Sequence, residues 1–247
     1  MRNRIWHFAL CDNTIHVEAM KHQGRVTIEH HICQISTDDK VLALQLRATH
    51  GEGADETDFN HYSRHIDCKR RMRDPRQEVK CCRLSLSILV ACRQIHQEAA
   101  LLPYKGNVFS VDLYHTFTHF LKALVPAQAN AIEQLTTVCY THFASATFQK
   151  LLRSKLKGLK ELVCFLQSPR EIMDGTACAA RNFTVDGWAE CLLQFADAPL
   201  TTAIVALHPH HYVLVRMQML DTSRPRTYHA ARQWTAEIER KLIASTV

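Results

Sequence analysis

The sequence predicts an α/β fold in which helices cover a mostly parallel sheet. Three runs in the C-terminal half are rich in β-prone residues, and a leucine leads each of them: AIEQLTTVCY, LKGLKELVCFL and APLTTAIVAL. Patterns typical of amphipathic helices fill the gaps between these runs, and a further helical pattern leads directly into the alternating run NVFSVDL. Strands that alternate with helices along a chain pair in parallel, because each helix crosses back over the sheet.

The composition is typical of a globular protein with a substantial core. The chain has 247 residues, of which 47% are hydrophobic and 22% are charged. A chain of this length buries most of the apolar surface that it exposes when unfolded. No apolar run approaches the roughly 18–20 residues that span a bilayer, so we expect a soluble protein without a membrane partner.

The N-terminal part predicts a short helix, a hairpin and a long polar insertion. Residues 2–10 have the apolar spacing of a helix, and the alternation in residues 14–32 predicts two strands joined by a polar turn at 21–24. From about residue 36 to 79 the apolar residues show no regular spacing, apart from a brief apolar alternation at 41–46. Long polar stretches with charge blocks are typical of flexible segments. We therefore predict a flexible charged insertion at about 47–80.

The most regular pattern is LVACRQIHQEAALLPYKGNVFSV, residues 89–111. Apolar residues at alternating spacings of four and three draw one stripe along a helix: Ile88, Cys92, Ile95, Ala99 and Leu102. Pro103 and Gly106 end the predicted helix, and the strand NVFSVDL follows. We expect the stripe to be buried against the sheet.

The remaining patterns predict that the same core continues to the C-terminus. Helices are predicted at about 116–125, 146–157 and 186–196, HYVLVRMQML predicts another strand, and a helix from about residue 225 closes the chain. The leading leucines Leu135, Leu159 and Leu200 are separated by 24 and 41 residues (159−135 and 200−159). The first separation matches a leucine-rich-repeat period. We divide the chain into residues 1–125 and a repeat-like region at 126–247, within one continuous core.

The regular stretch resembles the signature of a large group of uncharacterised fungal proteins that share a domain of unknown function. Their members carry a Cys-Arg-Gln-Ile-x-x-Glu-Ala helix followed by Leu-x-Tyr-x-x-Asn-x-Phe. The matching positions are Cys92, Arg93, Gln94, Ile95, Glu98, Ala99, Leu102, Tyr104, Asn107 and Phe109. The opening RNRIWHFAL is similar to the Leu-Arg-Asn-x-Ile-Tyr start of the same group, which itself resembles the first helices of an F-box.

The resemblance implies a truncated F-box-like helix and hairpin, packed on an irregular leucine-rich-repeat-like sheet, and structural roles for the signature residues. It also implies an adaptor subunit of a ubiquitin ligase as a partner. The Leu-Pro-x-Glu segment that usually precedes the Arg-Asn-x-Ile motif would lie before Met1, which weakens that implication. Arg93 and Glu98 are not four residues apart, so they do not pair along the helix. We predict that the Arg93 guanidinium instead clamps the N-terminal helix and hairpin to the sheet.

The spacing of the ten cysteines and sixteen histidines predicts no metal site. Neither a Cys-x-x-Cys pair nor a His-Glu-x-x-His motif is present in the sequence, and these are the usual local signatures of zinc ligands. We interpret the clusters HHIC, at residues 30–33, and HPHH, at 208–211, as polar surface groups. The cysteines are expected to be free thiols in a reducing compartment, the cytoplasm or the nucleus.

No pattern predicts catalytic or cofactor-binding residues. A Gly-x-Ser-x-Gly nucleophile turn is absent from the sequence. The one close pair of glycines, Gly51 and Gly53, lies in an acidic stretch, whereas a phosphate-binding loop needs clustered glycines between a strand and a helix. We therefore predict no cofactor and no enzymatic activity.

A basic run, KRRMR, lies within the predicted insertion. Lys69, Arg70, Arg71 and Arg73 fit a solvated linker or a nuclear-import patch. Non-specific binding of nucleic acid usually needs several phosphate contacts with interleaved aromatic side chains, and the nearest aromatic residue is Tyr62. Nucleic acid is therefore not an expected partner.

Together these features predict a non-enzymatic protein–protein interaction module of unknown partner, with a degenerate F-box-type adaptor as one form. The alternative is a cytosolic enzyme that uses the histidines near residues 208–211. A degenerate or truncated product without activity is a third interpretation.

Overall fold

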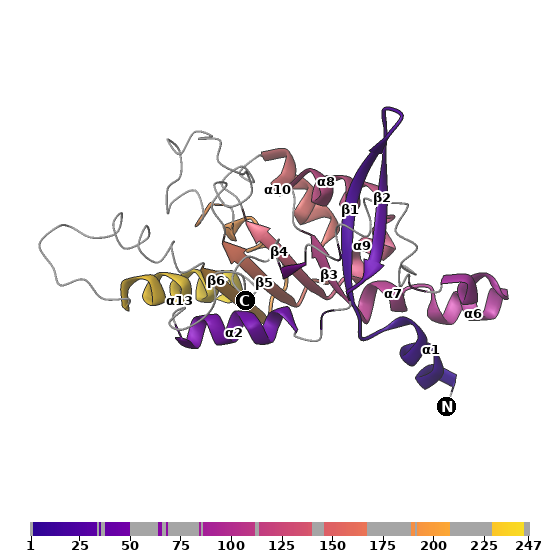
Figure 1. Cartoon of the computed structure of the whole chain (residues 1–247), viewed down its shortest axis with the longest axis horizontal. Coiled ribbons are helices and arrows are strands. Elements are labelled where there is room, and N and C mark those ends of the chain that lie inside the picture. Colours follow the sequence, from indigo (N-terminus) through magenta and orange to yellow (C-terminus); the bar gives the residue numbers. More distant parts are fainter. Residues whose placement is uncertain are drawn as a thin grey trace, which may run out of the picture.

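Six strands form one mixed sheet in the computed structural model, in the order β2-β1-β3-β4-β5-β6 (Figure 1). β2 runs antiparallel to β1, and every other neighbouring pair is parallel. The structure describes residues 2–33, 35, 38–49, 64–65, 68, 84, 86–111, 114–139, 146–166, 189–190, 192–207 and 229–244. The predicted α/β class is confirmed.

The elements follow one another in the order expected for a sheet with helical crossovers. The strands are β1 (Thr14–His22), β2 (Arg25–Ile32), β3 (Val108–Val111), β4 (Gln134–Cys139), β5 (Glu161–Leu166) and β6 (Thr202–Leu207). The helices include α1 (Arg2–Leu10), α2 (Asp39–Thr49), α6 (Arg93–Ala99), α7 (Leu102–Lys105), α8 (Tyr114–Ala123), α9 (Pro126–Ala131), α10 (Ala146–Lys155), α13 (His229–Ala244) and the 3₁₀ helix η1 (Leu86–Val90).

β1 and β2 form the predicted hairpin, joined by a two-residue turn. Gln23 and Gly24 have φ angles of 48° and 80°, and positive φ at both central residues is the requirement of a type I′ hairpin turn. Glycine adopts this conformation without strain because it has no Cβ. The prediction of α1 and of this hairpin is confirmed.

One face of the sheet carries an apolar row. Ile15, Phe109, Leu135 and Leu162 lie in register across β1, β3, β4 and β5, and all four side chains are buried. α8 packs on this row, with the ring of Phe120 centred 5.3 Å from that of Phe109. This face therefore holds the main hydrophobic core.

The next residue along each strand points to the opposite face, because side chains alternate in a β-strand. His16, Ser110 and Thr136 form this second row, and they too are buried. His31 is the direct partner of His16 in the β1–β2 pair. His16 and His31 therefore lie on the polar face, away from α8.

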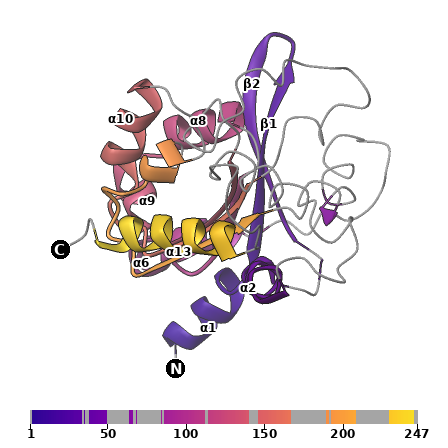
Figure 2. The ribbon, with the colours of Figure 1, turned by 90° about the vertical axis from the view of Figure 1, so that its left-hand side faces the viewer.

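Helices cover the sheet from two directions. α8 and α10 lie together, and the ring of Phe117 is centred 5.4 Å from Phe148 and 6.3 Å from Phe195. α2 and α13 contact β6 and lie away from α8 and α10 (Figures 1 and 2). Glu239 of α13 accepts a hydrogen bond from the backbone N–H of Val205 at 2.9 Å, which covers the edge strand.

We expected an irregular polar stretch after residue 36, but residues 39–49 form the helix α2. Leu42, Ala43 and Leu46 are buried and Leu44 is exposed, which is the spacing of a helix rather than the two-residue alternation read from the sequence. The Oδ1 atom of Asp38 accepts the N–H of Lys40 at 2.8 Å and caps the helix. Of the predicted insertion at 47–80, the structure describes residues 47–49, 64–65 and 68.

The long helix predicted from residue 88 to 102 is wrong. The chain forms η1, α6 and α7 instead, because Cys92 has extended backbone, with φ −157° and ψ 160°. Ala99 is the one fully buried member of the predicted stripe, Cys92 is exposed, and Ile95 is half-buried. α6 extends away from the sheet (Figure 1), so the predicted stripe is not buried against the sheet along its whole length.

The chain from β3 onward follows the prediction more closely. The strands β3 to β6 and the helices α8, α10 and α13 form where the patterns placed them. Pro126, expected only to end α8, also begins α9, because its fixed φ suits the first helical position. The strand predicted at 211–220 lies outside the described residues, and the F-box-like and repeat-like features stay predictions.

Candidate functional site

Two histidines and two cysteines from three parts of the chain converge beside the hairpin. His16 lies on β1, Cys33 follows β2, and His65 and Cys68 belong to the stretch between α2 and η1. One donor atom from each of the four side chains lies within 4.8 Å of all the others. We call these four residues the His–Cys cluster.

The pairing of β1 with β2 positions two members of the His–Cys cluster, His16 and Cys33. The backbone N–H of Cys33 donates to the carbonyl of Thr14 at 2.7 Å, so the strand pairing continues one residue beyond β2. Cys33 therefore lies on the same face of the hairpin as His31, which is two residues before it. His16, the cross-strand partner of His31, lies on that face too. The ring of His16 is centred 5.0 Å from that of His31 and 4.4 Å from that of His65.

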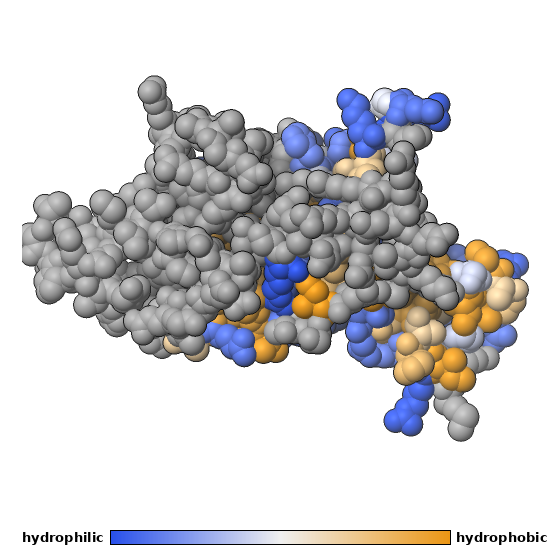
Figure 3. Space-filling model, in the orientation of Figure 1, coloured by the Kyte–Doolittle hydropathy of each residue, from blue (hydrophilic) through white to orange (hydrophobic). Residues whose placement is uncertain are grey.

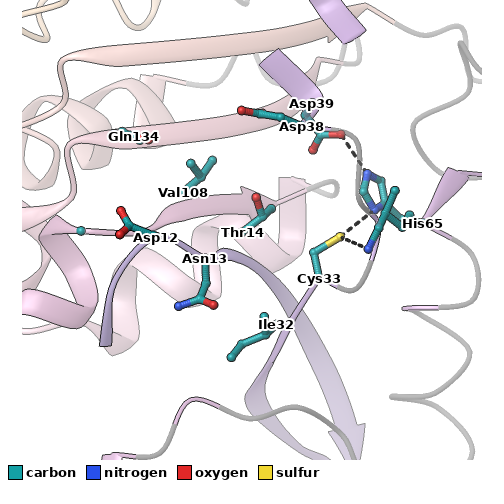
Figure 4. A pocket seen from close by; sticks show the side chains of 12 residues that line it. Asp12, Asn13, Thr14, Ile32, Cys33, Asp38, Asp39, His65, Val108 and Gln134 are labelled. Atoms are coloured by element: carbon teal, nitrogen blue, oxygen red, sulfur yellow. Dashed lines mark hydrogen bonds and ion pairs between the residues drawn. The ribbon is translucent and has the colours of Figure 1, made fainter. Parts of the chain in front are cut away.

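A carboxylate positions the third member. The Nε2 atom of His65 lies 3.0 Å from Oδ1 of Asp39, the first residue of α2, and the guanidinium of Arg64 lies 3.1 Å from the same oxygen. Nδ1 of His65 faces Sγ of Cys33 at 3.6 Å (Figure 4). Asp39 and His65 are both buried, so this arrangement is held away from water.

The two thiols of the cluster influence each other. A hydrogen bond from the Cys33 thiol lowers the pKa of Cys68, and the same bond raises the pKa of Cys33. The neighbouring imidazoles of His16, His31 and His65 lower the pKa of Cys68 further, against the opposing effect of its burial. Cys68 is therefore the favoured thiolate, which is the form of cysteine that binds metals and attacks disulfides.

A pocket of about 400 Å³ opens beside the cluster, with Cys33 and His65 in its wall (Figure 4). It lies at the amino ends of three parallel strands, marked by Thr14, Val108 and Gln134. Open parallel sheets usually bind substrates at the opposite, carboxyl edge. The residues that directly follow β3, β4, β5 and β6 at that edge lie outside the described part of the chain.

The sequence analysis missed this cluster because its members are far apart in the chain. Cys33 and His31 belong to the HHIC motif that was considered, but His16, His65 and Cys68 were not connected with it. Thirty-two residues separate His65 from Cys33. The available signal was the pair His65-x-x-Cys68, which has ligand-like spacing in combination with the hairpin.

The signature residues divide into an exposed and a buried group. Arg93, Gln94 and Glu98 are exposed on α6, and Nε2 of Gln94 donates to Oε1 of Glu98 at 3.1 Å. Exposure of Arg93 does not support the predicted clamp on the N-terminal helix and hairpin. Tyr104 stacks on the buried Phe109, with ring centres 6.2 Å apart, and burial raises the pKa of Tyr104.

Asn107 makes the connection that was predicted for Arg93. Its buried amide Nδ2 donates to the carbonyls of Leu10, at 2.6 Å, and Pro103, at 2.8 Å. Its Oδ1 accepts the backbone N–H of Asn13 at 2.9 Å. One side chain thus joins the end of α1, the start of β1 and α7. An amide suits this position because it donates and accepts at once.

Exposed apolar side chains gather at the end of the molecule that carries α1 and α6 (Figure 3). We call this surface the apolar end, and its large exposed members are Ile5, Phe8, Leu86, Val90 and Leu101. Phe8 is 91% exposed and Val90 is 81% exposed. Contiguous exposed apolar surface of this kind is typical of contact sites for other proteins.

Other predicted features fall on residues that the structure does not describe. These are the basic run Lys69, Arg70, Arg71 and Arg73 and the histidine cluster at 208–211. In the described part of the chain, no helix is long and apolar enough to cross a membrane.

Comparison with known proteins identifies the family. Residues 1–170 match the sequence model of a domain of unknown function, DUF7730. No curated protein matches the chain, and no solved structure matches it. The matched residues contain the His–Cys cluster, the signature stretch and most of the sheet. Because the match covers well over half of its length, the chain belongs to the DUF7730 family.

Proposed function

We propose that the protein is a non-enzymatic interaction module that binds another protein through the apolar end. The observation that carries this proposal is the exposure of Phe8 on α1 (91%) and of Val90 on η1 (81%). Leaving large apolar side chains in water is unfavourable by about 25 cal/mol for each Å² of apolar surface. A partner that covers them recovers this free energy.

The charges around the apolar end indicate the chemistry of the partner. α1 contains Arg4 and His7, and the ring of His7 lies 3.3 Å from the carboxylate of Asp12. On α6, Arg93, His96 and Glu98 are exposed. Charges of both signs at the rim favour a partner whose apolar contact residues are surrounded by polar groups of complementary charge. We infer that the partner presents an apolar surface with charged groups of both signs at its edge.

The F-box-like start of the sequence supplies a specific candidate of this kind, an adaptor subunit of a ubiquitin ligase. The free thiols at Cys11 and Cys92, in the part of the chain that is described, support placing the interaction in a reducing compartment, the cytoplasm or the nucleus. Neither the adaptor nor the compartment is needed for the general proposal. Crosslinking to purified adaptor subunit tests this candidate separately from the general proposal.

Site-specific photocrosslinking tests the proposal. A benzoylphenylalanine is introduced at Phe8 or Val90, and matched controls carry it at Leu44 of α2 or Ile243 of α13, which are also exposed apolar residues. We expect one heterologous protein to crosslink from both positions of the apolar end and from neither control. The double variant Phe8→Ser/Val90→Ser should lose the same protein in a pull-down.

Three outcomes decide between the interpretations. A crosslink to purified adaptor subunit added at micromolar concentration would identify the ubiquitin-ligase form of the module. Crosslinks between two copies of this chain would assign the surface to self-association and overturn the proposal. Equal crosslinking from the control positions would also overturn it, because the apolar end would then have no preference.

A further inference from the structure

We propose that His16, Cys33, His65 and Cys68 bind one zinc ion that fastens His65 and Cys68 to the polar face of the β1–β2 hairpin. This inference is independent of the interaction proposed for the apolar end. It rests on the donor atoms, their spacing, their burial and the group that orients His65.

The donor set matches the preference of zinc. Two thiolate sulfurs and two imidazole nitrogens are the Cys₂His₂ set of structural zinc sites. Calcium and magnesium prefer oxygen donors, so the sulfurs argue against them. The set also balances charge, because two thiolates and two neutral histidines leave the complex with zinc without net charge. A neutral complex is far less costly to bury than an isolated ion.

The spacing fits tetrahedral coordination without a rearrangement of the hairpin. Zn–S bonds of about 2.3 Å and Zn–N bonds of about 2.05 Å at the tetrahedral angle place sulfur and nitrogen about 3.6 Å apart. Nδ1 of His65 lies 3.6 Å from Sγ of Cys33. The full set of four donors lies within 4.8 Å, so small rotations of the side chains bring the remaining distances into range.

Asp39 orients His65 as the partner of a metal ligand would. Its carboxylate Oδ1 lies 3.0 Å from Nε2 of His65 and favours the tautomer with the proton on Nε2. The lone pair of Nδ1 then points at the centre of the cluster. Histidines that bind zinc usually donate their other ring nitrogen to a carboxylate in this way. Arg64 balances the charge of Asp39 at 3.1 Å.

Burial and coordination number indicate a structural rather than a catalytic ion. His16, His65 and Cys68 are buried, and Cys33 is half-buried at the wall of the pocket. Four protein ligands complete a tetrahedron, whereas catalytic zinc keeps one position open for water. The ion would link Cys33 to His65 across thirty-two residues, and in this way hold His65 and Cys68 on the sheet.

A disulfide between Cys33 and Cys68 is the main competing interpretation of the same atoms. Both thiols are free in the structure. A disulfide would consume the two sulfur ligands and leave His16 and His65 without a metal to bind. The two interpretations therefore give opposite results for metal content and for free thiols.

Metal analysis of the full-length chain, purified with a non-metal-binding reductant, tests the proposal. We expect one zinc per chain by elemental analysis. X-ray absorption should show sulfur at about 2.3 Å and nitrogen at about 2.0 Å from zinc. Apoprotein titrated with Co²⁺ should develop the visible bands of tetrahedral cobalt and a thiolate charge-transfer band. Absence of metal together with absence of these bands would overturn the proposal.

Single substitutions test the ligand assignment. Cys33→Ser and Cys68→Ser should lose the zinc, while the matched control Cys11→Ser, a buried cysteine outside the cluster, should retain it. Asp39→Asn should bind zinc about 10–100-fold more weakly, since it removes the carboxylate that orients His65. His31→Asn should retain the zinc. Zinc bound at full occupancy by Cys68→Ser, or a Cys33–Cys68 disulfide in mass spectra of unreduced protein, would overturn the assignment.

Discussion

α6 is largely exposed to solvent, whereas the His–Cys cluster is largely buried. α6 carries the most regular part of the sequence, yet Arg93, Gln94 and Glu98 are exposed on it. The cluster is assembled from scattered residues, yet His16, His65 and Cys68 are buried. Burying polar groups is costly unless they have partners. The comparison indicates that the cluster contributes to folding, whereas the regular stretch at α6 is available for contact with other molecules.

The largest expected effect comes from removing zinc from the cluster. If free zinc is present at about 1,000 times its dissociation constant, binding to the folded state alone stabilises the protein by about 4 kcal/mol. Denaturant unfolding with and without a strong chelator measures this difference. The same chelator should leave the unfolding of Cys68→Ser unchanged, and an equal response of the variant would contradict a role for the cluster.

Asn107→Ala should lower the free energy of unfolding by about 3 kcal/mol. The substitution removes its hydrogen bonds to three backbone groups and to the Asn13 side chain, and it leaves buried backbone carbonyls unsatisfied. Asn130→Ala, an exposed asparagine of α9, is the control and should change stability by less than about 0.5 kcal/mol. Chemical denaturation of both variants decides the comparison. A small effect at Asn107 would show that α1 is not held by this side chain.

Gly106→Ala should cost about 1–3 kcal/mol, because a Cβ at this position would overlap the side chain of Cys11 and overpacking costs about this much. The double variant Gly106→Ala/Cys11→Ala removes the obstructing sulfur. It should be less destabilised than the sum of the two single variants, as measured by thermal unfolding. Additive effects would place the cause elsewhere.

The smallest effect is expected at the most conspicuous signature residue. Arg93→Ala should change the free energy of unfolding by less than about 0.5 kcal/mol, because its side chain is exposed in the first turn of α6. If Arg93 contacts the partner, the substitution should weaken crosslinking from Val90 without lowering the melting temperature. A clear loss of stability would restore the clamp that the sequence predicted.

Local patterns predicted the local parts of the fold. Alternation at β1 and β2, and the helical spacing of Phe117, Phe120 and Leu121, depend on neighbours within one element, so each was found from the residues alone. The helix α2 was misread because Leu42, Leu44 and Leu46 fit a two-residue period as well as a helical one. The break at Cys92 was missed because an apolar stripe does not show where a helix stops.

The candidate site could not be predicted in the same way. His16, Cys33, His65 and Cys68 lie in three separate stretches, and no local spacing joins them. The donors come within 4.8 Å through the pairing of β1 with β2 and the approach of His65 and Cys68 to the polar face of the hairpin. Asn107 was in the signature, but its three backbone partners could not be read from the sequence.

By itself, the sequence determined the α/β class, the positions of most strands and helices and the family signature, because these follow from periodicity over a few residues. The tertiary structure decided which face each side chain occupies, that α6 extends from the sheet, and that two histidines and two cysteines meet. Contacts between distant residues depend on how the elements pack together. That information is spread over the whole chain and has no local pattern.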